Sequence, residues 1–325
     1  MKRFVAPGLV IIAGLVFIVV TLAQNLFSVG TAFEELIDDF RPALQDEVLD
    51  QYRADIAGLA AVTDEFQTAV LPGLSQALGL TPEAMGGLLA DQFPAVNDGL
   101  ALLPQAVPTF GGLIDTLADQ QSNFLSADEI PTKNLPAQTV PWGFTIVGLI
   151  AIGLGAFMLL KGTRLGAILA LTLGVLIVVG SFVLSLPGKS GDADNLNEAL
   201  EPVYTVETVE GAKGALTVIG AMGQEMGTSM MPGIGQMLGM DADALNQFFG
   251  ANFPVTAQAL QTLPESMGRF DQLVQTFDAN LDNYETLKPV RFLPIIWIFI
   301  IGGFVIIAGG ALGFFWTKDE EEQAA

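Results

Sequence analysis

Four long apolar segments dominate the pattern of hydrophobic and polar positions along the chain. They contain no Asp, Glu, Lys or Arg and cover Phe4–Ala23, Pro141–Leu160, Leu165–Leu186 and Phe292–Thr317. A helix of about 20 apolar residues crosses the hydrocarbon core of a bilayer. Because lipid offers no hydrogen-bond partner to the backbone, such segments must be helical. The pattern therefore predicts an all-α integral membrane protein with four transmembrane helices.

Basic residues beside these segments predict their orientation. Lys2 and Arg3 precede the first segment, residues 161–164 join the second to the third, and Lys318 follows the fourth. Short cytoplasmic flanks are enriched in Lys and Arg, so we expect both termini in the cytoplasm and a plasma (inner) membrane location. The expected cytoplasmic parts are the N-terminus 1–3, the hairpin 161–164 and the acidic tail 318–325; the expected extracytoplasmic domains are 24–140 and 187–291.

A cleaved signal peptide is an alternative for the first segment. A basic start, an apolar run and Thr21-Leu22-Ala23 follow one another in the order of such a peptide. The run is long for a signal peptide, and the repeat described next requires a span at this place. We therefore expect Phe4–Ala23 to remain as a transmembrane helix.

The second half of the chain resembles the first half. Residues 61–124 align with residues 221–284 without a gap, and 18 of the 64 aligned pairs are identical. The same register places the first span on the third, and the second and fourth correspond with a small offset. A period this long indicates a duplicated unit of span, outer domain and span. Parallel repeats of this kind are related by an axis along the membrane normal.

The outer ranges carry the spacing of amphipathic helices. Residues 42–70 place Leu44, Val48, Tyr52 and further apolar residues on one face, with Pro42 suited to the first turn. Thr81-Pro82-Glu83 and Asp241-Ala242-Asp243 are helix start signals. Sustained strand-type alternation is absent from both ranges. We expect each outer range to form a small helical bundle.

Composition excludes several kinds of chemistry. The 325 residues include no Cys and no His, are 51% hydrophobic and carry a net charge of −22. A disulfide framework, a cysteine metal site and a Ser-His-Asp arrangement are thereby excluded. Carbohydrate cleavage by paired carboxylates is the remaining enzymatic alternative, but no acid pair has a cleft-forming context. We expect a non-enzymatic protein with no catalytic residues and no cofactor.

Methionines in the second half form the most suggestive cluster. Met222, Met226 and Met230 are spaced by four residues, and Met231, Met237 and Met240 follow. Thioethers are ligands for Cu(I), whereas methionine also fills irregular cores. The aligned residues of the first half are apolar and none is a ligand. We expect packing and no metal site, while a groove for a lipid tail is not distinguished from a core.

Acidic residues are concentrated in the two outer ranges. They carry 17 acids against 3 bases in residues 24–140 and 14 against 5 in residues 187–291. Asp192–Asn197 partly matches a calcium loop, but Leu196, Asn197 and Val203 occupy three of its key positions. Solvated acidic surfaces are expected instead. Such surfaces repel nucleic acid and favour a basic partner.

Gly188-Lys189-Ser190 matches the end of a phosphate-binding loop. That motif requires a glycine where Val183 stands and a preceding strand where a span is predicted. We therefore expect no nucleotide site.

Small residues recur within the predicted spans. Pairs such as Gly309 and Gly313, or Ala151 and Gly155, allow close approach of helices, as does the series Gly166, Ala170 and Gly174. Packing among the four spans explains them, and homodimerisation is the alternative. The spans lack the ionisable groups that coupled pumps require.

These patterns predict a protein of the cell envelope, with features compatible with a bacterium. Its paired helical ectodomains would bind a protein or lipid partner as a scaffold or accessory subunit. The alternative is a transporter or lipid conduit that uses the seam between the repeats and the apolar interior of the ectodomains. The binding residues are not identified by the sequence.

Overall fold

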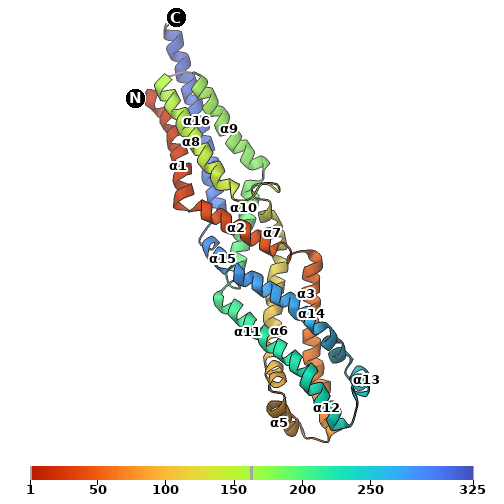
Figure 1. Cartoon of the computed structure of the whole chain (residues 1–325). Coiled ribbons are helices and arrows are strands. Elements are labelled where there is room, and N and C mark those ends of the chain that lie inside the picture. The colour runs from red at the N-terminus through yellow and green to blue at the C-terminus, as the bar shows by residue number, and fades with distance from the viewer. Residues whose placement is uncertain (1, 162–163, 325) are drawn as a thin grey trace. The chain divides into compact units, whose positions relative to one another are not determined.

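The computed structural model describes residues 2–161 and 164–324, with side chains for 4–161 and 164–316. Helices make up most of this part of the chain, and no strand occurs within it (Figure 1). The all-α prediction is confirmed. The predicted hairpin 161–164 and the terminal segments 1–3 and 318–325 lie partly outside the described residues.

Five of the described helices are long and apolar enough to cross a membrane, which fits a multi-pass membrane protein. Four correspond to the predicted spans: α1 (Lys2–Ala23), α8 (Thr139–Lys161), α9 (Arg164–Val183) and α16 (Phe292–Ala324). The fifth is α6 (Pro94–Asp119), which we did not predict as a span. Its uncharged stretch ends at Asp98 and Asp115 and is shorter than the roughly 20 residues of a usual span.

The chain divides into two compact units, and each combines segments from both halves of the sequence. Unit 1 comprises Met1–Asp39, Gln120–Glu201 and Asp282–Ala325, and unit 2 comprises Phe40–Asp119 and Pro202–Leu281. Both of the ranges expected to form separate outer bundles therefore contribute to unit 2.

Unit 1 contains the four helices that match the predicted spans. Within it α1 packs against α8 and α16, and α9 packs against α16 and α8 (Figure 1). Its remaining helices are shorter. They are α2 (Leu26–Phe40), α7 (Gln121–Asp128), α10 (Leu186–Leu200) and α15 (Leu281–Leu287), of which α2 and α15 extend one residue beyond the unit.

Left-handed backbone ends two of the span helices. Asn25 has φ 47° between α1 and α2, and Ser185 has φ 55° between α9 and α10. Positive φ is incompatible with a continuing right-handed helix. The third span was predicted to end at Leu186; within that range the helix α9 ends at Val183, and Leu186 begins α10.

Glycine allows the span helices of unit 1 to approach closely. A Cβ at Gly14 would lie 2.5 Å from the carbonyl oxygen of Gly148, and a Cβ at Gly174 would lie 2.7 Å from that of Gly303. Neither distance leaves room for a side chain. The first contact joins α1 to α8 and the second joins α9 to α16.

Unit 2 is built around four helices that pack in a closed order. α3 (Asp46–Glu65) packs against α6, α6 against α11 (Val206–Glu225), α11 against α14 (Pro254–Ala279), and α14 against α3. α3 begins at Asp46 rather than in the turn containing Pro42, where a start was predicted. Short elements connect these helices: the π-helices η1 (Phe66–Val70) and η2 (Met226–Met230), and the α-helices α4 (Leu71–Leu78), α5 (Pro82–Gln92), α12 (Met231–Leu238) and α13 (Ala242–Asn252).

Side-chain caps begin two of these short helices where the sequence predicted. The Thr81 hydroxyl accepts a hydrogen bond of 3.2 Å from the Ala84 N–H, and Asp241 Oδ1 accepts one of 2.8 Å from the Ala244 N–H. Both start signals are confirmed.

Aromatic rings fill the interior of unit 2. Phe270 lies 5.7 Å from Tyr52 and 5.5 Å from Phe110, measured between ring centroids. All three side chains are buried. The long helices from the two halves of the chain therefore share one core.

Candidate functional site

The methionine cluster divides between the interior and the surface of unit 2. Met222, Met226 and Met230 are buried at 3%, 4% and 1% exposure. Met237, in contrast, is 44% exposed. The first three side chains are therefore part of the core.

Acidic residues of unit 1 bind the backbone near the first residues of α8 and α16. Glu34 accepts a hydrogen bond from the Ala137 N–H just before α8. Asp194 accepts hydrogen bonds of 2.7 and 3.0 Å from the N–H groups of Phe292 and Leu293, which begin α16. These carboxylates complement the positive ends of the helix dipoles. Asp194 caps α16, whereas Glu34 binds the turn before α8. Neither contact has a local sequence signal, because each carboxylate and its partners are far apart along the chain.

The partial calcium loop and the Gly-Lys-Ser motif both lie within helix α10. Asp192 accepts a hydrogen bond from the Ser126 hydroxyl. The Lys189 ammonium donates to the carbonyl oxygen of Glu129 at 2.8 Å. Ser190 is buried. The helical backbone forms neither a calcium loop nor a phosphate-binding loop.

The small residues of the spans face neighbouring helices of unit 1. A Cβ at Gly309 would meet Val10 and the Ala6 carbonyl oxygen, and a Cβ at Gly155 would meet Ile11. Ala170 is completely buried. Packing within the chain accounts for these contacts.

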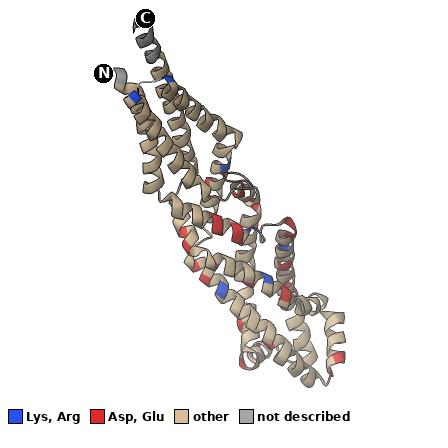
Figure 2. Ribbon diagram, turned by 45° about the horizontal axis from the view of Figure 1, so that its top comes forward, with Lys and Arg blue, Asp and Glu red and all other residues tan. Residues whose placement is uncertain are grey.

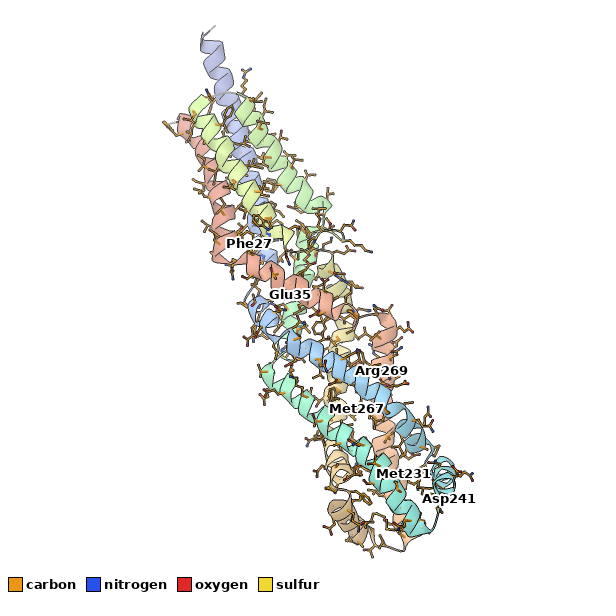
Figure 3. The ribbon with its side chains drawn as sticks, in the orientation of Figure 1. Phe27, Glu35, Met231, Asp241, Met267 and Arg269 are labelled. Carbon is orange, nitrogen blue, oxygen red and sulfur yellow. The ribbon has the colours of Figure 1, made fainter. Side chains whose placement is uncertain are left out.

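A polar network joins α3 to α14 in unit 2. Arg269 donates from Nε to Asp55 Oδ2 at 2.8 Å and from Nη2 to Asp55 Oδ1 at 2.7 Å. The Ser266 hydroxyl donates to Asp55 Oδ1 at 2.6 Å. Figure 3 shows Arg269 on α14, which packs against α3. The bidentate geometry belongs to the stronger class of charge-assisted hydrogen bonds.

The same network changes the acidity of its members. The hydrogen bond from Arg269 to the Asp55 carboxylate raises the pKa of the Arg269 guanidinium above its usual range. Burial raises the pKa of the nearby Tyr52 phenol, and the positive charge of Arg269 opposes that increase. Arg269 therefore stays protonated and Tyr52 stays neutral at physiological pH.

A cleft of 220 Å³ opens beside this network, between α3 and α14. Its apolar lining includes Leu59, Val62 and Leu263. Its polar lining is formed by Asp55, Ser266, Gln258 and Thr262. We call it the Asp55 cleft. This cleft was not predicted from the sequence, because α3 and α14 come from opposite halves of the chain and no local pattern indicates that they pack together.

Two glutamates make long-range contacts elsewhere in unit 2. Glu65 accepts hydrogen bonds from the N–H groups of Val255 and Thr256 at the start of α14, at 3.3 and 2.6 Å. Glu225 accepts one of 2.8 Å from the Val96 N–H at the start of α6. Each glutamate satisfies backbone donors that the helix itself leaves free.

Among the described residues, no group of three or more His, Cys, Asp or Glu is placed to hold a metal ion. Comparisons with protein-family models, with curated proteins and with solved structures found no match to this chain. Function must therefore be argued from the chain itself.

Proposed function

We propose that this chain is a non-enzymatic membrane protein of the cell envelope whose unit 2 binds a protein or lipid partner on the extracytoplasmic face. α1, α8, α9 and α16 would cross the plasma or inner membrane, with both termini in the cytoplasm. Unit 1 would anchor the chain, and unit 2 would present the binding surface.

Matching features at aligned positions of the two halves support a duplicated architecture. The π-helices begin at Phe66 and Met226, and left-handed glycines end α4 and α12 at Gly79 and Gly239. Composition alone does not account for special backbone conformations at equivalent places. A duplication would place two copies of a span–outer segment–span unit in the chain.

The charge of unit 2 is the observation that carries the proposal. Unit 2 contains 19 acids and 4 bases, from 11 and 2 in residues 40–119 and 8 and 2 in residues 202–281. Figure 2 shows acidic residues along its helices, while the helices of the span bundle are mostly uncharged. The negative electrostatic field of unit 2 repels anionic head groups and nucleic acid and attracts basic surfaces. A protein partner with a basic surface is therefore favoured over an anionic lipid.

Charge also favours four spans rather than five. α6 is the least apolar of the five candidate helices, and it carries Asp98, Asp115 and Asp119. Its partners in unit 2 include α11 and α3, which carry several acids and bases. Placing these charges in lipid would be costly. We therefore assign α6 to the extracytoplasmic part.

Cross-linking of the full chain on the outer face of intact cells tests the partner proposal. We expect a defined basic protein to be recovered, and recovery to fall as salt rises because exposed charges are screened. The variant Asp91→Asn, Asp98→Asn, Glu210→Gln removes three exposed charges of unit 2 and should reduce the yield. A matched variant Gln67→Asn, Gln76→Asn, Gln236→Asn keeps the charge and should not. Repeated recovery of no partner, or equal recovery with both variants, would count against the proposal.

The lipid-conduit alternative finds less support. An apolar pocket in unit 1, lined by residues that include Leu26, Phe33 and Ile296, has a volume of only 50 Å³. At about 30 Å³ per water, this space is smaller than two waters. Phe144 stacks on Phe299 within the span bundle, and Phe17 contacts Phe144 edge-on and Phe299 at a tilted angle. Both features favour a span bundle that anchors the chain in the membrane over one that conducts lipid.

A further inference from the structure

The Asp55 cleft lies at one of two comparable helix–helix interfaces in unit 2, which we call seams. The seam of α3 with α14 joins a helix of the first half to a helix of the second half, and so does the seam of α11 with α6. The alignment of the two halves, extended without a gap, relates the residues of one seam to those of the other. Differences between the seams therefore show what is particular to the cleft.

The two seams differ in the size of the side chains at aligned positions. Met222 of α11 fits against Gly99 of α6, where a Cβ would lie 2.5 Å from the methionine sulfur. The residues of the first seam aligned with Val218 and Met222 are Gly58 and Val62. A Cβ at Gly58 would meet nothing within 4 Å. Both Gly58 and Val62 line the cleft, and each is smaller than the residue aligned with it.

The polar network is also confined to the first seam. Asp55, Ser266 and Arg269 align with Ala215, Ala106 and Thr109. The second seam thus packs α11 against α6 without a counterpart of these three polar side chains. The Arg269 and Asp55 side chains are 29% and 10% exposed, so the pair is in reach of solvent at the edge of the cleft.

The cleft offers hydrogen-bond acceptors more than donors. The Ser266 hydroxyl proton is directed to Asp55, and the Thr262 hydroxyl faces the carbonyl oxygens of Gln258 and Ala259 at 3.5 and 3.4 Å. Asp55 accepts three hydrogen bonds in all. A carboxylate has about four acceptor positions, so one remains on Oδ2. Arg269 is not among the residues that line the cleft. Of the lining side chains, the Gln258 amide can donate, while the oxygens of Asp55, Ser266 and Thr262 suit a ligand that brings its own donors.

We propose that the Asp55 cleft binds a small primary alkylammonium ion. The ammonium group donates to Asp55 and to the oxygen atoms of Ser266 and Thr262. The hydrocarbon chain lies on Leu59, Val62 and Leu263. The volume of 220 Å³ equals about seven waters of about 30 Å³, which corresponds to about seven heavy atoms. The excess of acids in unit 2 attracts this cation and repels a carboxylate of the same size.

Isothermal titration of the full chain in a non-ionic detergent tests the proposal with n-hexylammonium as the probe. We expect saturable binding of one ion per chain. Hexanoate and hexanol carry a similar hydrocarbon chain but no ammonium group, and we expect neither to bind. Equal heats from hexanol would show that only the apolar surface binds and would overturn the proposal.

Gly58→Leu fills the cleft with a side chain for which the structure has space. We expect it to raise the dissociation constant at least about tenfold, the effect of losing roughly 1.4 kcal/mol of binding free energy. Gly211→Leu is the matched control, because Gly211 lies on α11, is exposed and also has nothing within 4 Å of a Cβ. It should bind like the unaltered chain. Binding that survives Gly58→Leu would be diffuse attraction to an acidic surface and would overturn the proposal.

A second variant tests the polar network without leaving a lone buried charge. Asp55→Ala combined with Arg269→Thr introduces the residues of the second seam. We expect the chain to remain folded, as judged by far-UV circular dichroism, and to lose hexylammonium binding. Undiminished binding by this folded variant would overturn the role of Asp55. The experiment contains no partner protein, so its outcome is independent of the function proposed above.

Discussion

Glu65 accepts a hydrogen bond of 2.6 Å from the backbone N–H of Thr256, which lies 191 residues further along the chain. α14 begins after Phe253, whose side chain cannot cap a helix. The carboxylate at the end of α3 supplies that cap through space. In the other seam Glu225, which aligns with Glu65, binds the start of α6 in the same way.

Removing this cap is expected to destabilise unit 2. Glu65→Ala should lower the free energy of unfolding by about 1–2 kcal/mol, because it leaves backbone donors without a partner. Glu65→Gln retains an acceptor and should cost less. Thermal unfolding followed by far-UV circular dichroism measures both. Glu210→Ala, an exposed glutamate on α11, serves as the control and should change stability by no more than about 0.5 kcal/mol. Equal losses at Glu65 and Glu210 would contradict the capping role.

Close packing of the spans predicts a position-dependent response to alanine. Gly14→Ala forces a methyl group against the Gly148 carbonyl oxygen and should destabilise the chain by about 1–3 kcal/mol. Gly174→Ala should act in the same direction at Gly303. Gly8→Ala lies on the same helix as Gly14, and its Cβ would meet nothing within 4 Å. We expect no loss there in a thermal unfolding series in detergent. If Gly8→Ala were as damaging as Gly14→Ala, the contact between α1 and α8 would be refuted.

Alkaline pH is expected to weaken the fold through Tyr284. Burial and the negative charge of Glu201 raise the pKa of this phenol from 10.0 to about 12, while Arg291 opposes the increase. The folded state thus favours the neutral phenol, whose hydroxyl donates to the Asn197 carbonyl oxygen at 2.9 Å. The stabilisation is complete below pH 10 and is lost as pH rises from 10 to about 12.

Tyr284→Phe tests this pH dependence. It should cost about 1 kcal/mol at neutral pH through the lost hydrogen bond. It should also reduce the fall in stability between pH 10 and about 12. A spectrophotometric titration of the unaltered chain minus that of the variant should show a phenolate transition near pH 12. A difference transition centred at pH 10 would rule out the raised pKa.

The absence of cysteine allows a direct test of topology with single introduced thiols. Ser229→Cys and Gln105→Cys lie on exposed positions of η2 and α6. We expect a membrane-impermeant maleimide to label both from outside intact cells. Thr163→Cys, in the predicted cytoplasmic hairpin, should react only after permeabilisation. Protection of Gln105→Cys together with labelling of Ser229→Cys would indicate that α6 crosses the membrane.

The sequence determined the features that follow from local chemistry. Uncharged runs such as Phe4–Ala23 must be helical in lipid whatever surrounds them, and Thr81 and Asp241 cap helices that begin directly after them. The end of α9 at Val183 has no signal in the hydrophobic pattern, because Leu184-Ser185-Leu186 continues the uncharged run and the turn at Ser185 depends on a backbone angle.

The pairing of the apolar helix faces is known from the tertiary structure and not from the sequence. Amphipathic spacing identifies the buried face of α3 but does not say whether α6, α14 or both cover it, because hydrophobic burial is not directional. The closed order of four helices brings Asp55 to Arg269 and Glu65 to Thr256, across separations of 214 and 191 residues. That pairing also forms the Asp55 cleft, which is lined by Gly58 and Val62 of α3 together with residues of α14.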